Sequence, residues 1–252
     1  MQIMSKVFLS DYSKVYNIVY KNKKYSQEVN YTLKILSNNR DKIKDILDLG
    51  SGTGNHLIFF KRKKINILGV EKSCKMIDLA KPNVKNLILK SDIKRLNLKK
   101  RFDAVTSLFH VVSYFNQNYE LELFFKTAHK HLKKNGLFFF DFWFTPAVKF
   151  LKPTKKIKYF KNNNFVLKKT SIPKILKKNI VKVNFVFSIK FNDKKEKIFK
   201  ETHKVRHFNI DELTFFANKA GFDYINSYKM LTTTKPNKRS WGVCMVLKKS
   251  NK

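Results

Sequence analysis

Over the first 145 residues, short apolar runs alternate with segments of helical periodicity, and this order restricts the fold to few classes. Five runs rich in Ile, Leu, Val and Phe are predicted strands: Asp45–Leu49, Asn66–Glu71, Asn86–Asp92, Phe102–Leu108 and Gly136–Trp143. They lack a strict apolar–polar alternation, as expected of strands that are covered on both faces. The clearest helix between them spans Tyr119–Lys134, and Gly136 follows it, as is common just past a helix. The order predicts a doubly wound, mostly parallel α/β sheet with right-handed crossovers.

The pattern changes after Pro146 to that of an antiparallel sheet. Every odd position of Val181–Phe191 is apolar, which is typical of a strand with one buried face. Four strands are expected here: Lys155–Tyr159, Phe165–Thr170, Val181–Phe191 and Ile198–Phe208. We therefore expect an antiparallel β insert over residues 150–208.

Helical periodicity returns after the insert, where Asn209 and Glu212 resemble a capping box, and Gly221 ends the helix. Two closing strands, Phe222–Met230 and Trp241–Leu247, are expected to form a terminal hairpin. The expected organisation is an N-terminal helical lid over 1–40, an α/β domain made of 41–149 and 209–252, and the insert between its two parts.

The charge balance is strongly basic, with 54 Lys and Arg against 18 Asp and Glu and a net charge of +36. Only six of the basic residues are arginine, whose planar fork nucleic-acid recognition favours. Because the lysines are spread through nearly every segment, we interpret the charge mainly as a compositional bias. The alternative is a true anionic partner.

Other global features point to a cytoplasmic protein. No apolar run approaches the ~18 residues that a membrane span needs, and the N-terminal residues contain no export signal. Cys74 and Cys244 form neither a disulfide framework nor a metal-ligand cluster, so we expect a reducing compartment and no bound metal.

The segment ILDLGSGTGNH, residues 46–56, carries the strongest functional signal. Gly50, Gly52 and Gly54 follow a buried strand and precede a helix, so the backbone can turn sharply and approach a ligand closely. Asn55 stands where a dinucleotide fingerprint needs its third glycine, and there is no G-K-[ST] triplet for a nucleotide triphosphate. The alternative is a purely structural turn.

Acidic residues end the next two strands. Glu71, at the end of the second strand, is placed to accept both ribose hydroxyls of an adenosine ligand. Asp92, after Ser91 at the end of the third, can accept from an adenine amino group, or it can cap the helix that starts at Ile93. Met76 is expected to cover the adenine face, unless it is an ordinary core residue.

Five motifs in order, D-L-G-S-G-T-G, G-V-E-K-S-x-x-M, S-D, F-D-A-V-T-S-L-F and L-K-K-N-G-L-F-F-F-D, resemble the class I S-adenosylmethionine-dependent methyltransferases over residues 43–145. The resemblance implies a Rossmann-like sheet of seven strands, the terminal one antiparallel, and S-adenosylmethionine as cofactor. It also implies that Asp48 and the loop backbone hold the methionine part, with Glu71 on the ribose and Asp92 on the adenine. The expected cofactor contacts are Tyr12, Tyr20, Tyr25, Asp48, Gly50, Ser51, Gly52, Gly54, Glu71, Lys72, Met76, Ser91, Asp92, Ile93 and Leu108.

A narrower resemblance reaches both ends of the chain. Tyr12–Tyr25 (YSKVYNIVYKNKKY) is similar to the lead-in Y-x-x-x-Y-D-x-x-Y…K-D-Y of N-methyltransferases of nucleotide-linked amino sugars. Those proteins also have an aromatic pair and Pro after the fifth strand, like Phe142–Pro146, and a closing strand like Arg239–Val243. This chain departs from the pattern with Asn17 and Lys24 in place of Asp, which leaves the substrate open.

The tyrosines of the lead-in, Tyr12, Tyr16, Tyr20 and Tyr25, are candidates to close over the cofactor carboxylate. Of these, Tyr12 and Tyr20 are the preferred contacts. The alternative is a stripe of tyrosines that packs a helix on the sheet.

Methyl transfer asks mainly for positioning and for exclusion of water. His110 and Tyr114 follow the fourth strand and are catalytic candidates that would take a proton from the acceptor, or else packed residues. His203 and His207 share one face of an insert strand, with Arg206 on the other, and His207 is the third catalytic candidate. The candidate substrate contacts are Trp143, Arg206 and Arg239, with Arg239 as a clamp for a phosphate.

The expected reaction is methyl transfer to a small molecule, and the narrower resemblance indicates the amine of a nucleotide-linked sugar as the acceptor. A nucleic-acid methyltransferase is the first alternative, but S-L-F-H follows the fourth strand where an amino base would need N/D-P-P-Y/F, so nucleic acid is not the expected partner. A non-catalytic cofactor-binding subunit is the second. Exposed strand edges of the insert would allow pairing in a homodimer.

Overall fold

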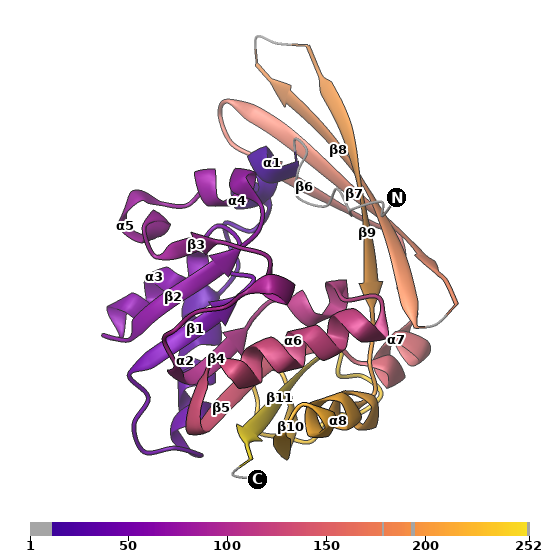
Figure 1. Cartoon of the computed structure of the whole chain (residues 1–252). Helices are drawn as coiled ribbons and strands as arrows, with labels where there is room; N and C mark the ends of the chain where they lie inside the picture. The colour runs from indigo at the N-terminus through magenta and orange to yellow at the C-terminus, as the bar shows by residue number, and fades with distance from the viewer. Residues whose placement is uncertain (1–11, 178, 193–194, 251–252) are drawn as a thin grey trace.

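The computed structural model describes residues 12–177, 179–192 and 195–250, with side chains from Val15 onward, and contains two sheets (Figure 1). The strands of the larger sheet are β1 (Asp45–Leu49), β2 (Asn66–Glu71), β3 (Ile88–Lys90), β4 (Phe102–Ser107), β5 (Leu132–Trp143), β10 (Phe222–Lys229) and β11 (Gly242–Lys249). Their order is β10-β11-β5-β4-β1-β2-β3, and only β11 runs antiparallel to its neighbours. The predicted Rossmann-like sheet of seven strands and its terminal hairpin are therefore confirmed.

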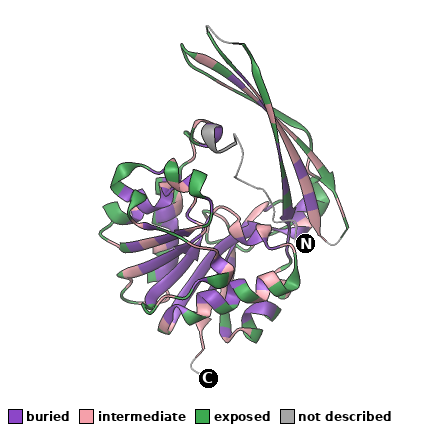
Figure 2. Ribbon diagram, turned by 45° about the horizontal axis from the view of Figure 1, so that its top comes forward, coloured by how far each residue is buried: buried purple, intermediate pink, exposed green. Residues whose placement is uncertain are grey.

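Helices cover both faces of this sheet. On one face lie α6 (Asn118–Lys130) and α8 (Ile210–Lys219), and on the other lie α2 (Tyr25–Ser37), α3 (Asn55–Arg62) and the short α5 (Pro82–Lys85). Strand β5 contributes to both cores because its side chains alternate: Phe138 and Phe140 face the first pair of helices, and Phe139 faces the second group. Figure 2 shows the central strands buried along most of their length.

The helix predicted over Tyr119–Lys134 ends earlier, at Lys130, and β5 begins at Leu132 rather than at Gly136. Long-range contacts favour an extended backbone over a helical one from this point on. The backbone N–H of Phe102 donates to the carbonyl of His131 at 2.8 Å, and the Lys133 ammonium pairs with Asp103 at 3.0 Å. Helical periodicity alone carries no information about these partners.

The second sheet has the order β6-β7-β8-β9 and is antiparallel throughout, as predicted for the insert. Its strands are β6 (Lys156–Lys161), β7 (Phe165–Ile175), β8 (Ile180–Phe191) and β9 (Lys197–Arg206). Strand β7 is longer than predicted and includes Pro173. The last β6 partner of β7 is Ser171, so Pro173 lies beyond the pairing with β6, where its missing N–H costs no ladder bond.

Two small apolar clusters join the sheets. Helix α1 (Tyr12–Val19) packs Val15 and Tyr16 against Leu167 and Phe187 of the insert, and α7 (Thr145–Leu151) places Val148 against the insert strand β8. These contacts hold the insert sheet over the carboxyl ends of β1, β2, β4 and β5 (Figure 1).

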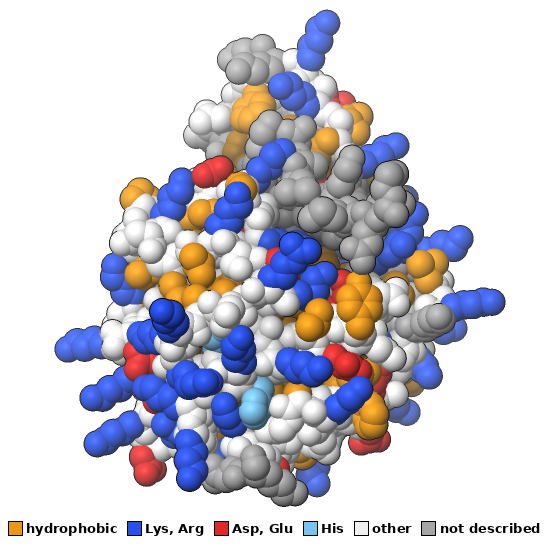
Figure 3. Space-filling model, in the orientation of Figure 1, with side chains coloured by type: hydrophobic (Ala, Val, Ile, Leu, Met, Phe, Trp, Pro, Cys, Tyr) orange, Lys and Arg blue, Asp and Glu red, His pale blue; other side chains and the backbone are white. Residues whose placement is uncertain are grey.

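Three further observations concern the surface charge, the character of the helices and the start of α8. Lys and Arg are spread over the visible face in Figure 3 rather than gathered in one patch. Among the residues that the structure describes, no helix has the length and apolar character to cross a membrane. The capping box predicted at Asn209 is wrong, because Asn209 makes no side-chain cap and Glu212 pairs with Arg206 instead.

Candidate active site

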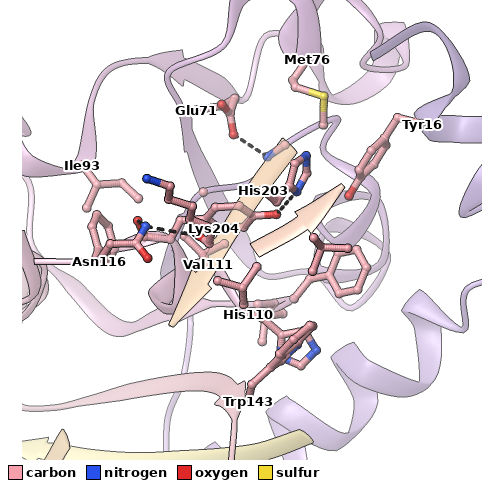
Figure 4. A pocket seen from close by; sticks show the side chains of 18 of the residues that line it. Tyr16, Glu71, Met76, Ile93, His110, Val111, Asn116, Trp143, His203 and Lys204 are labelled. Atoms are coloured by element: carbon pink, nitrogen blue, oxygen red, sulfur yellow. Dashed lines mark hydrogen bonds between the residues drawn. The ribbon is translucent and has the colours of Figure 1, made fainter. Parts of the chain in front are cut away.

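A cavity of about 980 Å³ lies between the carboxyl ends of the parallel strands and the insert sheet. Its size suits a ligand site. Figure 4 shows Glu71 and Met76 toward one end and Trp143 toward the other. Most of the predicted site residues line it: Tyr20, Tyr25, Gly50, Ser51, Gly52, Glu71, Lys72, Met76, Ser91, Asp92, Ile93, Leu108, His110, Tyr114 and Trp143.

The glycine loop forms one wall. Gly50, Gly52 and Gly54 all have positive φ, at 82°, 57° and 72°. A Cβ on Gly50 would lie 2.7 Å from the methyl groups of Val111, so side chains are excluded there by contact as well as by conformation. At Gly52 the nearest atom to such a Cβ is 3.5 Å away, on Met76, and the backbone borders the open cavity.

Glu71 is fixed beside this loop. Its Oε2 accepts from the backbone N–H of Gly52 at 3.1 Å and its Oε1 from that of Ser73 at 2.8 Å. Burial raises the pKa of Glu71 above its ordinary value, although the backbone donors oppose the shift. The carboxylate is thus oriented at the cavity by main-chain bonds before any ligand arrives.

Asp92 lies at the end of the third strand and also lines the cavity. Its Oδ1 accepts from the backbone N–H of Lys94 at 2.9 Å and caps the 3₁₀ helix η1 (Ile93–Arg95). The capping role considered for this residue is confirmed, and contact with an adenine stays a prediction. Met76 is 2% exposed and lines the cavity, so it is both a packed residue and a wall.

Asp48 and Gly54 do not line the cavity. Asp48 is 1% exposed, beneath the loop, and accepts from the hydroxyl of Thr106 at 2.8 Å. Burial raises the pKa of Asp48 to about 6, against the opposing effects of His56 and Thr106. This carboxyl supports the loop from below.

Three tyrosines of the lead-in, Tyr16, Tyr20 and Tyr25, line the cavity. The rings of Tyr16 and Tyr20 are 4.7 Å apart, and that of Tyr20 lies edge-on to Phe109 at 5.1 Å. Burial raises the pKa of Tyr25 to about 12, so its hydroxyl keeps its proton. The side chain of Tyr12 lies outside the described residues.

His110 begins the turn after β4 with φ of 62°. Its Nδ1 lies 2.8 Å from Oδ2 of Asp141, and its backbone N–H donates to Oδ1 of the same residue at 3.2 Å. Burial by itself would raise the pKa of Asp141, but the charge and hydrogen bonds of His110 outweigh it and the pKa is lowered. Trp143 lies edge-on to His110 and contacts Trp241, so two indoles complete this end.

Three predicted site residues lie away from the cavity. His207 is buried with Nδ1 2.9 Å from the hydroxyl of Thr145, and Arg206 pairs with Glu212. Arg239 lies over the ring of Phe150 at 5.6 Å. The structure therefore does not bring His207, Arg206 or Arg239 to the expected place, because their partners come from α7 and α8.

Several cavity residues were not predicted from the sequence. His56 follows the glycine loop directly, and its Nε2 lies 2.7 Å from Glu28 of α2. Its position next to the loop was a usable signal. His203 was noted only as sharing a strand face with His207, and its role depends on Tyr114, which is distant in the sequence. Asp141 does not line the cavity and gave no signal, because its role depends on its pairing with His110.

The residues present fit S-adenosylmethionine. The side-chain oxygen of Ser51 is buried and has no hydrogen-bond partner among the described residues, and it lies next to Gly50, where a Cβ has no room. Glu71 and Asp92 supply carboxylates in the order that a ribose and an adenine need. Within the described ranges, no three His, Cys, Asp or Glu side chains are grouped to bind a metal.

Comparison with known families agrees with this geometry. A family model described as "Methyltransferase domain" matches residues 46–136, which include the loop, Glu71 and Asp92. The segment 46–136 is a class I S-adenosylmethionine-dependent methyltransferase domain. S-adenosylmethionine is the methyl donor of this family.

The relatives within the family are distant. A dTDP-3-amino-3,4,6-trideoxy-alpha-D-glucopyranose N,N-dimethyltransferase of Streptomyces venezuelae is 27% identical over 139 residues, which are 54% of this chain and 59% of that protein. The chain thus spans less than two thirds of that relative's length.

Solved structures share the whole architecture. A methyltransferase from Clostridium acetobutylicum superposes with a TM-score of 0.79 at 19% identity, over 95% of this chain and 98% of its own. CalS10, an amino pentose methyltransferase from Micromonospora echinaspora, gives 0.77 at 18% identity, over 96% and 97%. At these identities the likeness shows the fold, including the insert sheet.

Proposed function

We propose that this protein transfers a methyl group from S-adenosylmethionine to the amine of a nucleotide-linked sugar. One observation carries the proposal: a single cavity joins the glycine loop, Glu71 and Asp92 to a second compartment formed by the ends of β4 and β5 and by the insert sheet. The amino-sugar N,N-dimethyltransferase among the relatives supports the choice of acceptor.

The chain's contribution begins with holding the donor. Bound S-adenosylmethionine supplies a methyl group on a sulfonium, which the lone pair of an acceptor nitrogen takes while the carbon–sulfur electron pair stays on sulfur. Glu71 would accept from the ribose hydroxyls and Asp92 from the adenine amino group, with the loop backbone along the methionine part. Asp48, at the end of β1 just before the loop, is held by the hydroxyl of Thr106 on the neighbouring strand β4.

Positioning and exclusion of water supply most of the remaining rate. Holding two reactants in line can remove on the order of 7–11 kcal/mol of the barrier. Part of the cavity lining is aromatic and includes Tyr16, Tyr20 and Phe109, with Trp143 and Trp241 at one end. His110, held by Asp141, is in reach of an acceptor at this end and would accept a hydrogen bond from its amine, which orients the nitrogen lone pair.

Lysines of the insert side favour an acceptor that carries phosphate. Lys152, Lys156 and Lys204 line the cavity together with Thr154 and Ser171. Their ammonium groups would neutralise a diphosphate as point charges. In this proposal these lysines bind the phosphates, the role that was expected of Arg239.

The test is a screen of nucleotide-linked amino sugars with the methyl donor, read by mass spectrometry. We expect a gain of ~14 Da, or twice that after a second transfer, on amino sugars and none on the matching hydroxy sugars, because the neutral nitrogen is the stronger nucleophile. Methylation of RNA at ~150 mM salt, or no transfer to any acceptor while the donor binds, would instead favour a nucleic-acid enzyme or a non-catalytic subunit.

Lysine variants test the mode of acceptor binding. Lys156→Met and Lys204→Met should each raise the KM for the nucleotide-linked acceptor several-fold at low salt, with less effect on kcat. Lys126→Met, on the exposed face of α6, is the matched control. An unchanged KM in both cavity variants would place the phosphates elsewhere.

A further inference from the structure

A second buried pair of imidazole and carboxylate comes from the insert sheet, and its imidazole lines the cavity. His203 and Glu201 lie two residues apart on β9, where they are 3% and 6% exposed. Nδ1 of His203 lies 2.9 Å from the hydroxyl of Tyr114, and its Nε2 lies 3.4 Å from Oε1 of Glu201. Tyr114 and His203 both line the cavity, and His203 is labelled in Figure 4.

The two contacts of His203 favour one tautomer of its imidazole. When the imidazole is neutral with its proton on Nε2, the hydroxyl of Tyr114 is the donor to Nδ1, and the protonated nitrogen is the one that lies near Glu201. A buried carboxylate is costly unless it is paired, so Glu201 favours an imidazole that keeps its Nε2 proton. The three side chains therefore form a series from the cavity into the interior: the hydroxyl of Tyr114, the imidazole of His203 and the buried carboxylate of Glu201.

We propose that Tyr114, His203 and Glu201 form a proton relay that takes up the proton released by the acceptor nitrogen. The inference rests on the proposed amine methylation. After methyl transfer the acceptor nitrogen is positively charged, and it must lose one proton to become the neutral methylated amine. That proton passes to the oxygen of Tyr114 as the hydroxyl proton moves to Nδ1 of His203. The imidazolium is held by Glu201 until it loses one proton to water.

The groups around His203 leave it ready to accept. Burial lowers the pKa of His203, Glu201 raises it, and the ammonium of Lys169 on β7 lowers it, with a net lowering. Phe185 of β8 lies edge-on to the ring at 5.0 Å, and Tyr20, which follows α1, acts electrostatically on Tyr114. The imidazole is therefore neutral at pH 7.

The role differs from that of His110. His110 and Asp141 lie at the ends of β4 and β5, whereas two members of the relay, His203 and Glu201, come from the insert strand β9. His110 orients the amine, and Tyr114 receives its proton. The insert thus supplies chemistry to the site as well as covering it.

The first experiment needs no acceptor. In ¹⁵N NMR titrations of the whole protein, the imidazole of His203 should titrate below the ordinary 6.5, and Glu201→Gln should lower its midpoint further, because it removes the contribution that raises the pKa. Tyr114→Phe should change the Nδ1 shift. An imidazole that titrates at the ordinary value and responds to neither substitution would overturn the relay, whatever acceptor is found.

The second experiment measures kcat against pH with saturating amino sugar. The wild type should lose activity at acid pH as His203 takes a proton, and His203→Gln and Tyr114→Phe should lower kcat by roughly 10²-fold and remove that limb. His131→Gln, a buried histidine that does not line the cavity, should cost stability and leave the limb in place. If the wild type methylates and the relay variants keep its profile, the relay is refuted while the proposed function stands. If no acceptor is methylated, the proposed function fails and the titration alone decides whether the three groups are coupled.

Discussion

Asp141 holds His110 through both of its carboxylate oxygens, one 2.8 Å from Nδ1 and the other 3.2 Å from the backbone nitrogen. The two residues are brought together because β4 and β5 are adjacent parallel strands, so their carboxyl ends meet at one edge of the sheet. The carboxylate fixes the ring and its tautomer at the entrance to the second compartment.

Replacing Asp141 by Asn should lower kcat roughly 10- to 100-fold with a smaller change in KM, because the ring loses its orientation. The pKa of Asp141 is lowered in the folded protein, so its stabilising contribution is present above the ordinary 3.8 and is lost as pH falls through the lowered folded value. The difference in free energy of unfolding between wild type and Asp141→Asn should thus be largest at pH 7 and shrink below about pH 4. Urea unfolding at several pH values checks this, and the exposed Asp223→Asn should show neither effect.

Glu71→Gln should weaken binding of the methyl donor by about 1–3 kcal/mol, because hydrogen bonds to a charged acceptor are replaced by weaker ones. Burial raises the pKa of Glu71, so affinity in the wild type should also fall as pH drops through that raised value, and the variant should lose this dependence. Calorimetry measures both. The control is Asp78→Asn, an exposed acid on the short helix α4 (Cys74–Asp78). Equal affinity of wild type and Glu71→Gln would contradict the assignment of the ribose site.

Gly50→Ala should destabilise the loop by about 1–3 kcal/mol, since it forces an L residue into a positive φ and a contact with Val111. Donor binding should weaken in parallel. Gly242→Ala is the matched control, because a Cβ there would meet its nearest atoms at 3.6 Å without a positive φ. Denaturant unfolding that finds the two variants alike would show that the loop tolerates side chains.

Asp48→Asn should stabilise the protein at neutral pH. Burial raises the folded pKa of Asp48 to about 6 from 3.8, so the cost of the buried charge is absent below the lower value and complete above the higher one. The gain over wild type should grow between pH 4 and 7 toward roughly 1–3 kcal/mol, since the amide oxygen still accepts from Thr106. Asp103→Asn gives the opposite sign, because the pKa of Asp103 is lowered by its backbone and lysine partners against the effect of burial. A gain that does not depend on pH would refute the argument.

The sequence by itself determined the fold class and the donor side of the site. Strand, loop and helix follow one another within residues 45–62, so the spacing of three glycines and the acid that ends the next strand are local information. The odd-position apolar pattern of the insert was equally readable, because strand side chains alternate between faces. What these features share is that residues near in sequence are also near in space.

The residues that form the acceptor side of the site could be identified only from the tertiary structure. Tyr114 meets His203 across 89 residues and His110 meets Asp141 across 31, and no periodicity encodes either meeting. The same holds for two predicted residues that do not reach the cavity, since Arg206 is buried against Glu212 and His207 against Thr145. A polar side chain in the interior needs a partner, and which partner it finds depends on how the insert sheet is laid over the larger one.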